Sequence, residues 1–278
     1  MKRLVLLLAV CGLVLSAGAA GWLWLLPPSQ ERALARIQKL GGKVHVEESY
    51  REHPVVKVEL KDCPAGDDDV ALLSAFPRLQ YLVLDNTHIT PAGMKHFAAL
   101  KQLHGLVLGG PRAGGEGLKH LSAVTSLREL RLENTTLTAD GLTALSRMLA
   151  LESLELANVP LNDDGLLRLM GLLNLQRLTL QRTAITNAGL AYLGSLPELE
   201  ELSLASPHLG DAGLVHLKTL RNLHELSLAD TAVSDAGLIH LQGMAGLREL
   251  DLSHTSVTEA GIAQLRKALP GAFIYRTP

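Results

Sequence analysis

The feature that most constrains the fold of this sequence is a 24-residue segment that recurs eight times without an insertion. The segment LQRLTLQRTAITNAGLAYLGSLPE opens at Leu175, and LEELSLASPHLGDAGLVHLKTLRN follows it directly. Each repeat opens with a leucine, and these leucines are Leu79, Leu103, Leu127, Leu151, Leu175, Leu199, Leu223 and Leu247. A fixed period of this length is typical of a solenoid, in which one supersecondary unit is stacked many times.

Each repeat contains a strand pattern followed by a helix pattern. When the opening leucine is position 1, positions 4 and 6 are leucine in all eight repeats, as in Leu178 and Leu180. Apolar residues at every second position predict a strand with one buried face. Position 15 is always glycine, and the apolar residues at positions 16, 19 and mostly 22, such as Leu190, Leu193 and Leu196, have helical spacing. Each repeat is therefore predicted to form a strand, a turn, a helix and a return.

Such a unit cannot bury its leucines alone, so neighbouring units must stack. Stacking places parallel strands about 4.8 Å apart, with the helices on the opposite side. Because helices need more room per repeat than strands, the stack should curve with the sheet on its inner face. The predicted fold class is α/β, a curved right-handed solenoid with a parallel β-sheet on the concave face and helices on the convex face.

The pattern resembles the leucine-rich repeat family, whose repeats follow LxxLxLxxN/C with a variable half. The ITxAGLxxL half at residues 185–193 is similar to the cysteine-containing subfamily of F-box adaptor proteins and to a group of bacterial exported leucine-rich repeat proteins. The resemblance covers roughly residue 55 to the C-terminus and implies the solenoid fold. Position 9, usually Asn or Cys in the family, is here Thr87, Pro111, Thr135, Val159, Thr183, Pro207, Thr231 and Thr255. We therefore expect no continuous ladder of amide side chains at that turn.

The N-terminal segment predicts export. Lys2 and Arg3 precede an apolar run over residues 4–26, which as a helix would be about 34 Å long and would span roughly 30 Å of hydrocarbon. The two basic residues favour a cytoplasmic N-terminus, so an uncleaved anchor would hold the repeats outside the cytoplasm. A signal peptide cleaved near Ala20 is the alternative, and a lipoprotein-type box before Cys11 is a third.

We expect four parts in the chain. They are an N-terminal signal-anchor, transmembrane segment or signal peptide over residues 1–28, an N-terminal cap with a helix and a strand over 29–54, a repeat domain over 55–270, and a C-terminal capping strand over 271–278. The repeat domain contains one degenerate repeat before the eight regular ones. In that degenerate repeat Cys63 stands at position 9 and Asp69 stands at the glycine position. Cys63 is interpreted as a buried structural thiol, with a reactive or intermolecular thiol as the alternative.

The composition gives no support to several classes of function. The formal charge is −2, from 26 basic and 28 acidic residues, and aromatic residues make up 3%, so neither nucleic acid nor an anionic surface is an expected partner. The glycine-rich stretch at 109–117 lacks the Lys-Ser/Thr of a phosphate-binding loop. His96, His120, His216 and His240 share position 18, but other repeats have Ala144 or Arg168 there, as expected for a solvated site. We predict no catalytic residue, no metal, no cofactor and no small-molecule substrate.

The inner sheet face is where this fold usually binds, and positions 3, 5, 7 and 8 are expected to point there. The candidate partner-binding residues are Tyr81, Val83, Val107, Arg131, Glu155, Arg177, Arg182, Glu201, Glu225, Glu249 and Asp251. We expect Arg131 to pair with Glu155 and Arg177 with Glu201 across neighbouring strands. The row of Glu201, Glu225 and Glu249 is either a solvated surface or a docking strip for a basic partner or a cation.

The sequence thus predicts a non-catalytic protein–protein interaction scaffold, exported or membrane-anchored through residues 4–26, that binds a protein partner on its concave face. One alternative is a structural envelope or adhesion protein without a defined ligand. The other is an intracellular F-box-type adaptor, which is disfavoured because the residues before Val55 hold only an apolar segment and a short cap.

Overall fold

The computed structural model describes residues 26–50 and 53–277, whose strands form one open 11-stranded sheet in sequence order. β1 and β2 are antiparallel, and every later neighbour is parallel. The strands are β1 (Lys43–Val46), β2 (Val55–Lys61), β3 (Tyr81–Asp85), β4 (Gly105–Gly109), β5 (Glu129–Glu133), β6 (Ser153–Ala157), β7 (Arg177–Gln181), β8 (Glu201–Ala205), β9 (Glu225–Ser227), β10 (Glu249–Asp251) and β11 (Phe273–Tyr275). The predicted anchor or signal segment lies almost wholly outside the described residues.

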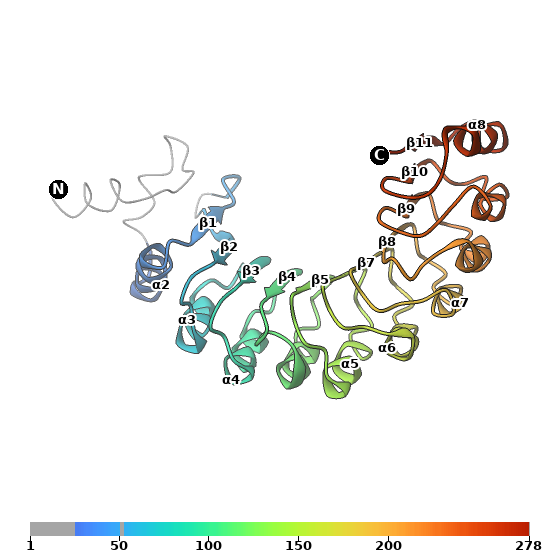
Figure 1. The fold of residues 1–278 in the computed structure, drawn as a ribbon. Coiled ribbons are helices and arrows are strands. Elements are labelled where there is room, and N and C mark those ends of the chain that lie inside the picture. Colours follow the sequence, from blue (N-terminus) through green and yellow to red (C-terminus); the bar gives the residue numbers. More distant parts are fainter. Residues whose placement is uncertain (1–25, 51–52, 278) are drawn as a thin grey trace.

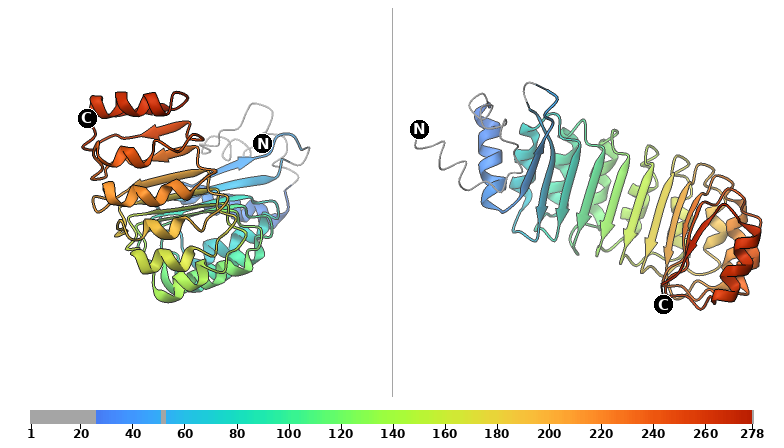
Figure 2. Two further views of the ribbon diagram at one scale, coloured as in Figure 1. Left: turned by 90° about the vertical axis from the view of Figure 1, so that its right-hand side faces the viewer. Right: turned by 90° about the horizontal axis from the view of Figure 1, so that it is seen from above.

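The chain bends into an arch, with the sheet on the inner face and the helices on the outer face (Figure 1). Seen from above, the strands lie side by side along the whole stack (Figure 2). The α-helices are α2 (Pro28–Lys39), α3 (Asp67–Leu72), α4 (Pro91–Met94), α5 (Ala139–Leu145), α6 (Asp163–Leu169), α7 (Leu190–Leu193) and α8 (Glu259–Ala268). The 3₁₀ helices are η2 (Leu73–Ala75), η3 (Lys95–Ala99), η4 (Gly115–Ala123), η5 (Asp211–Thr219) and η6 (Gly237–His240). The predicted α/β solenoid is confirmed, although several repeats form 3₁₀ rather than α-helical turns.

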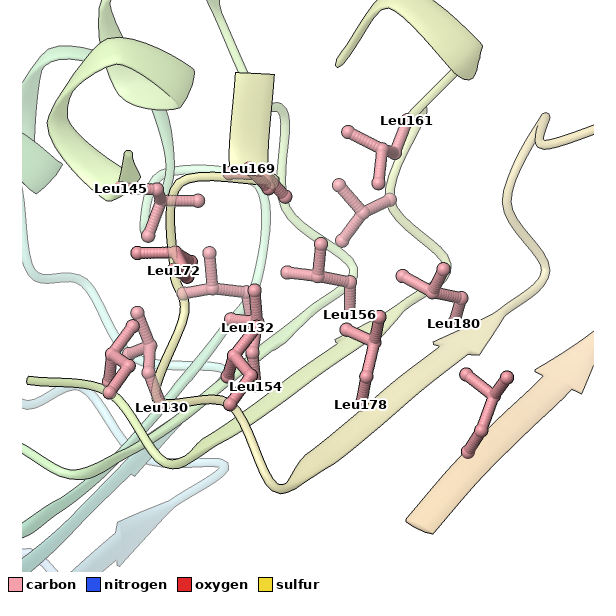
Figure 3. Packing of buried hydrophobic residues seen from close by; sticks show 14 of the residues in the cluster. Leu130, Leu132, Leu145, Leu154, Leu156, Leu161, Leu169, Leu172, Leu178 and Leu180 are labelled. Atoms are coloured by element: carbon pink, nitrogen blue, oxygen red, sulfur yellow. The ribbon is translucent and has the colours of Figure 1, made fainter. Parts of the chain in front are cut away.

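The repeat leucines form one continuous core between the sheet and the helices. Leu130, Leu154 and Leu178 are register neighbours on β5, β6 and β7, and each is at most 2% exposed. Figure 3 shows these strand leucines stacked below Leu145 and Leu169 of the helical side. Full burial of a leucine side chain contributes about 1.5–3 kcal/mol. The core therefore extends through every repeat rather than closing within any one of them.

The turn after most strands has a left-handed residue at position 8, and Ser206 after β8 is an exception. Asn86, Asn134 and Asn158 have φ angles of 50°, 53° and 52° there, which asparagine tolerates better than most residues. Asn158 Nδ2 donates to Asn134 Oδ1 at 2.6 Å, and Asn86 Nδ2 donates to Asp62 Oδ1 at 2.9 Å. The amide side chains thus pair one position before position 9. Their ladder is interrupted, because Gly110 occupies position 8 of the repeat between them.

Aspartates at position 13 tie one repeat to the next. Asp163 Oδ1 accepts from the Thr186 backbone N–H at 2.9 Å, and Asp163 Oδ2 accepts from Thr186 Oγ1 at 2.6 Å. The same pair of bonds recurs in Asp67–Thr90, Asp211–Ser234 and Asp235–Thr258. Hydrogen bonds to a charged group are roughly twice as strong as neutral ones. In these four pairs of repeats the carboxylate therefore fixes the position of one helical half against the next.

The same carboxylates explain the glycine at position 15 in four of the eight repeats, namely at Gly93, Gly189, Gly237 and Gly261. A Cβ atom on Gly189 would overlap the Asp163 carboxylate, and Gly237 stands in the same relation to Asp211. Gly189 has an ordinary right-handed φ of −62°, so its backbone conformation does not require glycine. In these four repeats the glycine is needed because the aspartate of the preceding repeat lies where a side chain would begin.

The first repeat breaks this rule, and helix α2 supplies the reason. Asp69 stands at the glycine position and faces Arg36 of α2, whose Nε donates to Oδ1 at 2.6 Å and whose Nη2 donates to Oδ2 at 3.1 Å. The Gly66 N–H adds a bond of 2.9 Å. Burial raises the pKa of Asp69, but the hydrogen bonds from Arg36 and Gly66 and the charge of Arg36 hold that pKa below its ordinary value of 3.8. Nearby, Cys63 is 7% exposed with a free thiol, as the structural interpretation expected.

We expect the substitution Asp163→Ala to lower the free energy of unfolding by about 1–3 kcal/mol, because it leaves the Thr186 N–H and hydroxyl without their acceptor. Asp164→Ala is the matched control. Asp164 is next in α6 and has no hydrogen-bond partner within the described chain, so its loss should cost about 0.5 kcal/mol or less. Urea unfolding monitored by circular dichroism measures both values. Equal effects of the two substitutions would contradict the tethering role.

The Arg36–Asp69 pair predicts a pH-dependent stability. Since the folded pKa of Asp69 is depressed, its contribution is present above the unfolded value of 3.8 and is lost as the pH falls through the folded pKa. Arg36→Gln should therefore destabilise the protein most near neutral pH, and its deficit should shrink below about pH 4. Arg32→Gln, on the same helix, removes only an exposed bond to the Pro28 carbonyl and should cause no such pH-dependent deficit. A deficit for Arg36→Gln that stays constant from pH 7 to about pH 2 would refute this assignment.

Candidate functional site

The concave face is apolar and aromatic at β3 and β4, whereas the adjacent β2 carries the Lys57–Glu59 ion pair. Tyr81, Val83 and Val107 lie on β3 and β4 and line a hollow of about 290 Å³. The ring of Tyr81 lies against Gly105, where a Cβ atom would overlap it, and 40% of Tyr81 stays exposed. This end of the face therefore offers a flat aromatic surface beside two partly exposed valines.

The carboxylates in the middle of the face are held in ion pairs. Arg131 lies 2.8 Å from Glu133 and 3.2 Å from Glu155, so the predicted Arg131–Glu155 pair is present. Arg177 instead pairs with Glu129 at 3.4 Å, two strands away, and the expected pairing with Glu201 is wrong. The register explains the difference, because the small Ser153 lies between Glu129 and Arg177 and leaves room for the long arginine side chain.

The C-terminal half of the face is acidic and uncompensated. Glu201, Glu225 and Glu249 are direct register neighbours on β8, β9 and β10. Within the described ranges, none of the three forms an ion pair with a basic side chain, and His224 is turned to Glu200 at 3.3 Å. Like charges at this strand spacing repel by about 1 kcal/mol per neighbouring pair in water. With Asp251, the row lines a hollow of about 420 Å³.

Tyr275 closes the acidic row and was not among the predicted residues. Its hydroxyl donates to Glu249 Oε1 at 3.1 Å. Burial, the charge of Asp251 and the bond to Glu249 raise the pKa of Tyr275 to about 12, so it remains a neutral donor near pH 7. The sequence did contain a signal, because Tyr275 stands at position 5 when the 24-residue count is continued.

Ten of the eleven predicted residues line two adjoining hollows, which share Ser153 and Glu155. Arg182 is the exception. It stands at position 8 with a φ of 50°, in the turn after β7, and borders a third hollow of about 720 Å³, which shares Arg131 and Asp251 with the other two. The structure thus places the predicted sheet residues on one surface and Arg182 at its margin.

Residues 26–50 and 53–277 contain no group of three or more His, Cys, Asp or Glu side chains placed to hold a metal ion. No helix in the same part of the chain has the length and apolar character needed to cross a membrane.

The comparisons with known proteins concern the repeats and the fold. A family model described as "Leucine Rich repeat" matches residues 125–146 and 219–241. No curated protein sequence is significantly similar to the chain. Among solved structures, an internalin (inlF) from Listeria monocytogenes is 22% identical, with a TM-score of 0.56 over 73% of this chain and 56% of that chain. This chain thus spans little more than half of that internalin, and the likeness concerns the fold.

A second internalin (inlC2), also from Listeria monocytogenes, is 20% identical, with a TM-score of 0.48 over 80% of this chain and 81% of that chain. A TM-score at this level supports no further conclusion.

Proposed function

This chain is a leucine-rich repeat protein, and we propose that it is a non-catalytic scaffold that binds a protein partner on its concave face. The observation that carries the proposal is the chemistry of that face. Ten predicted residues on β3 to β10 surround two adjoining hollows, and they include an exposed tyrosine, two valines and an uncompensated carboxylate row. Protein–protein interfaces typically combine apolar and aromatic anchor residues with polar or charged groups around them.

The proposal includes export. Lys2, Arg3 and the apolar residues 4–26 support a signal-anchor that holds the repeats outside the cytoplasm, with cleavage near Ala20 as the alternative. The proposal also includes four parts of the chain, at residues 1–28, 29–54, 55–270 and 271–278. The first part is the anchor, and the other three form the binding unit.

The full chain should be expressed with its own N-terminus and purified from detergent-solubilised envelopes of its host. We expect a stoichiometric partner with the wild type and its loss with Tyr81→Ala/Val107→Ala, since these truncations remove the apolar end of the face. Leu149→Ala/Ile239→Ala is the matched control, because Leu149 and Ile239 are 58% and 63% exposed and both lie off the sheet. Quantitative mass spectrometry reports the partner and the N-terminal peptide, and circular dichroism confirms folding.

Loss of the partner only with the control pair would contradict the proposed face. Absence of any stoichiometric partner would favour a structural envelope or adhesion protein. A mature N-terminus near Ala20 would replace the anchor by a cleaved signal peptide.

A further inference from the structure

We propose that the partner contributes an extended segment that crosses the strands of the concave face, with an apolar or aromatic side chain at one end and a basic stretch at the other. The apolar side chain would lie over Tyr81, Val83 and Val107. The basic side chains would lie over Glu201, Glu225 and Glu249. This inference rests on the proposed function and specifies the chemistry of the partner.

The charge distribution along the face supports this polarity. Arg131 pairs with both Glu133 and Glu155, and Arg177 pairs with Glu129, so each of these three carboxylates already has a cationic partner. Arg177 is the register neighbour of Glu201, but its guanidinium group pairs with Glu129 instead. Glu201 is therefore left without a cationic partner on the adjacent strand. The unpaired charge is therefore concentrated at β8 to β10.

The arrangement of the carboxylates favours a chain of cations over a single ion. Glu201, Glu225 and Glu249 project from consecutive strands at one register position, which spreads them along a line. Among the described residues no group of three acidic, His or Cys side chains converges as a metal site would require. Small residues at position 5, Ser203 and Ser227, leave the space beside this line open. Lysine or arginine side chains on an extended segment fit such a line.

The strand spacing sets the length of the segment. β4 and β8 are four spacings apart, about 19 Å, which an extended chain covers with about six residues. β8 and β10 are two spacings apart, about 10 Å or three residues. The matching partner segment therefore has an apolar or aromatic residue about six residues away from a basic stretch of three or four residues.

A synthetic peptide tests this match against the full chain purified in detergent. The probe has a tryptophan, five glycine or serine residues and a four-residue stretch with three lysines. A second probe carries the same elements in reverse order to test the opposite direction across the strands, and a third has glutamates in place of the lysines. Fluorescence anisotropy should show binding of at least one lysine probe that weakens as salt rises, and about tenfold or weaker binding of the glutamate probe.

The carboxylate row is tested with Glu201→Gln/Glu225→Gln, which removes two charges without changing side-chain size. We expect about a tenfold loss of lysine-probe affinity and a weaker salt dependence. Glu116→Gln/Glu198→Gln is the control, since it removes two charges off the sheet. Its affinity should stay within about twofold of the wild type. Failure of both lysine probes to bind at about 1 mM, or unchanged affinity of Glu201→Gln/Glu225→Gln, would overturn the inference.

The natural partner separates this inference from the proposed function. If Glu201→Gln/Glu225→Gln retains that partner while Tyr81→Ala/Val107→Ala loses it, the basic segment is refuted and the concave site stands. If both variants retain the partner, the concave site fails as well. Loss of the partner with both variants, and with neither control, supports the two together.

Discussion

The fold depends on one constraint, which is that no repeat of this chain can bury its own leucines. Leu154 on β6 is covered by Leu130 and Leu178 of the neighbouring strands and by the helical side above them, and the same relation holds along the stack. Stability is therefore shared between neighbouring repeats. The aspartates at position 13 fix how neighbouring repeats are aligned. Each of these carboxylates accepts hydrogen bonds from the next repeat and also lies so close to its glycine that a Cβ atom would not fit.

Because the core leucines and the aspartates hold the repeats together, the residues on the concave face can vary. Positions 4 and 6 are always leucine because they point into the core, whereas position 3 holds tyrosine, glycine, serine, arginine or glutamate in different repeats. The tethering hydrogen bonds join positions 12 and 13, so a change at position 3 or 5 leaves them in place. The change from apolar side chains near Tyr81 to acidic side chains near Glu249 is therefore not needed for folding.

The sequence predicted the solenoid because leucines recur at the same positions of every 24-residue repeat. Numbering the positions within the repeat also placed ten candidate residues on one face. It did not predict the tethers. Asp163 looks like an ordinary helix-start residue, and only the stacked structure shows that position 13 of one repeat lies against positions 12 and 15 of the next. Asp69 was recognised as atypical, but its partner Arg36 lies in a helix outside the repeat pattern. The pairing of Arg177 failed because only adjacent strands were considered, although an arginine can reach across a serine.

The central claim is that the inner face, and not the helical face, meets the partner. A photoreactive residue at Thr179, in the middle of the sheet, and another at Arg168, exposed on α6, would test this in cells that express the full chain. The account predicts a discrete cross-linked protein from position 179 and none from position 168. A discrete adduct from position 168 with none from position 179 would contradict it.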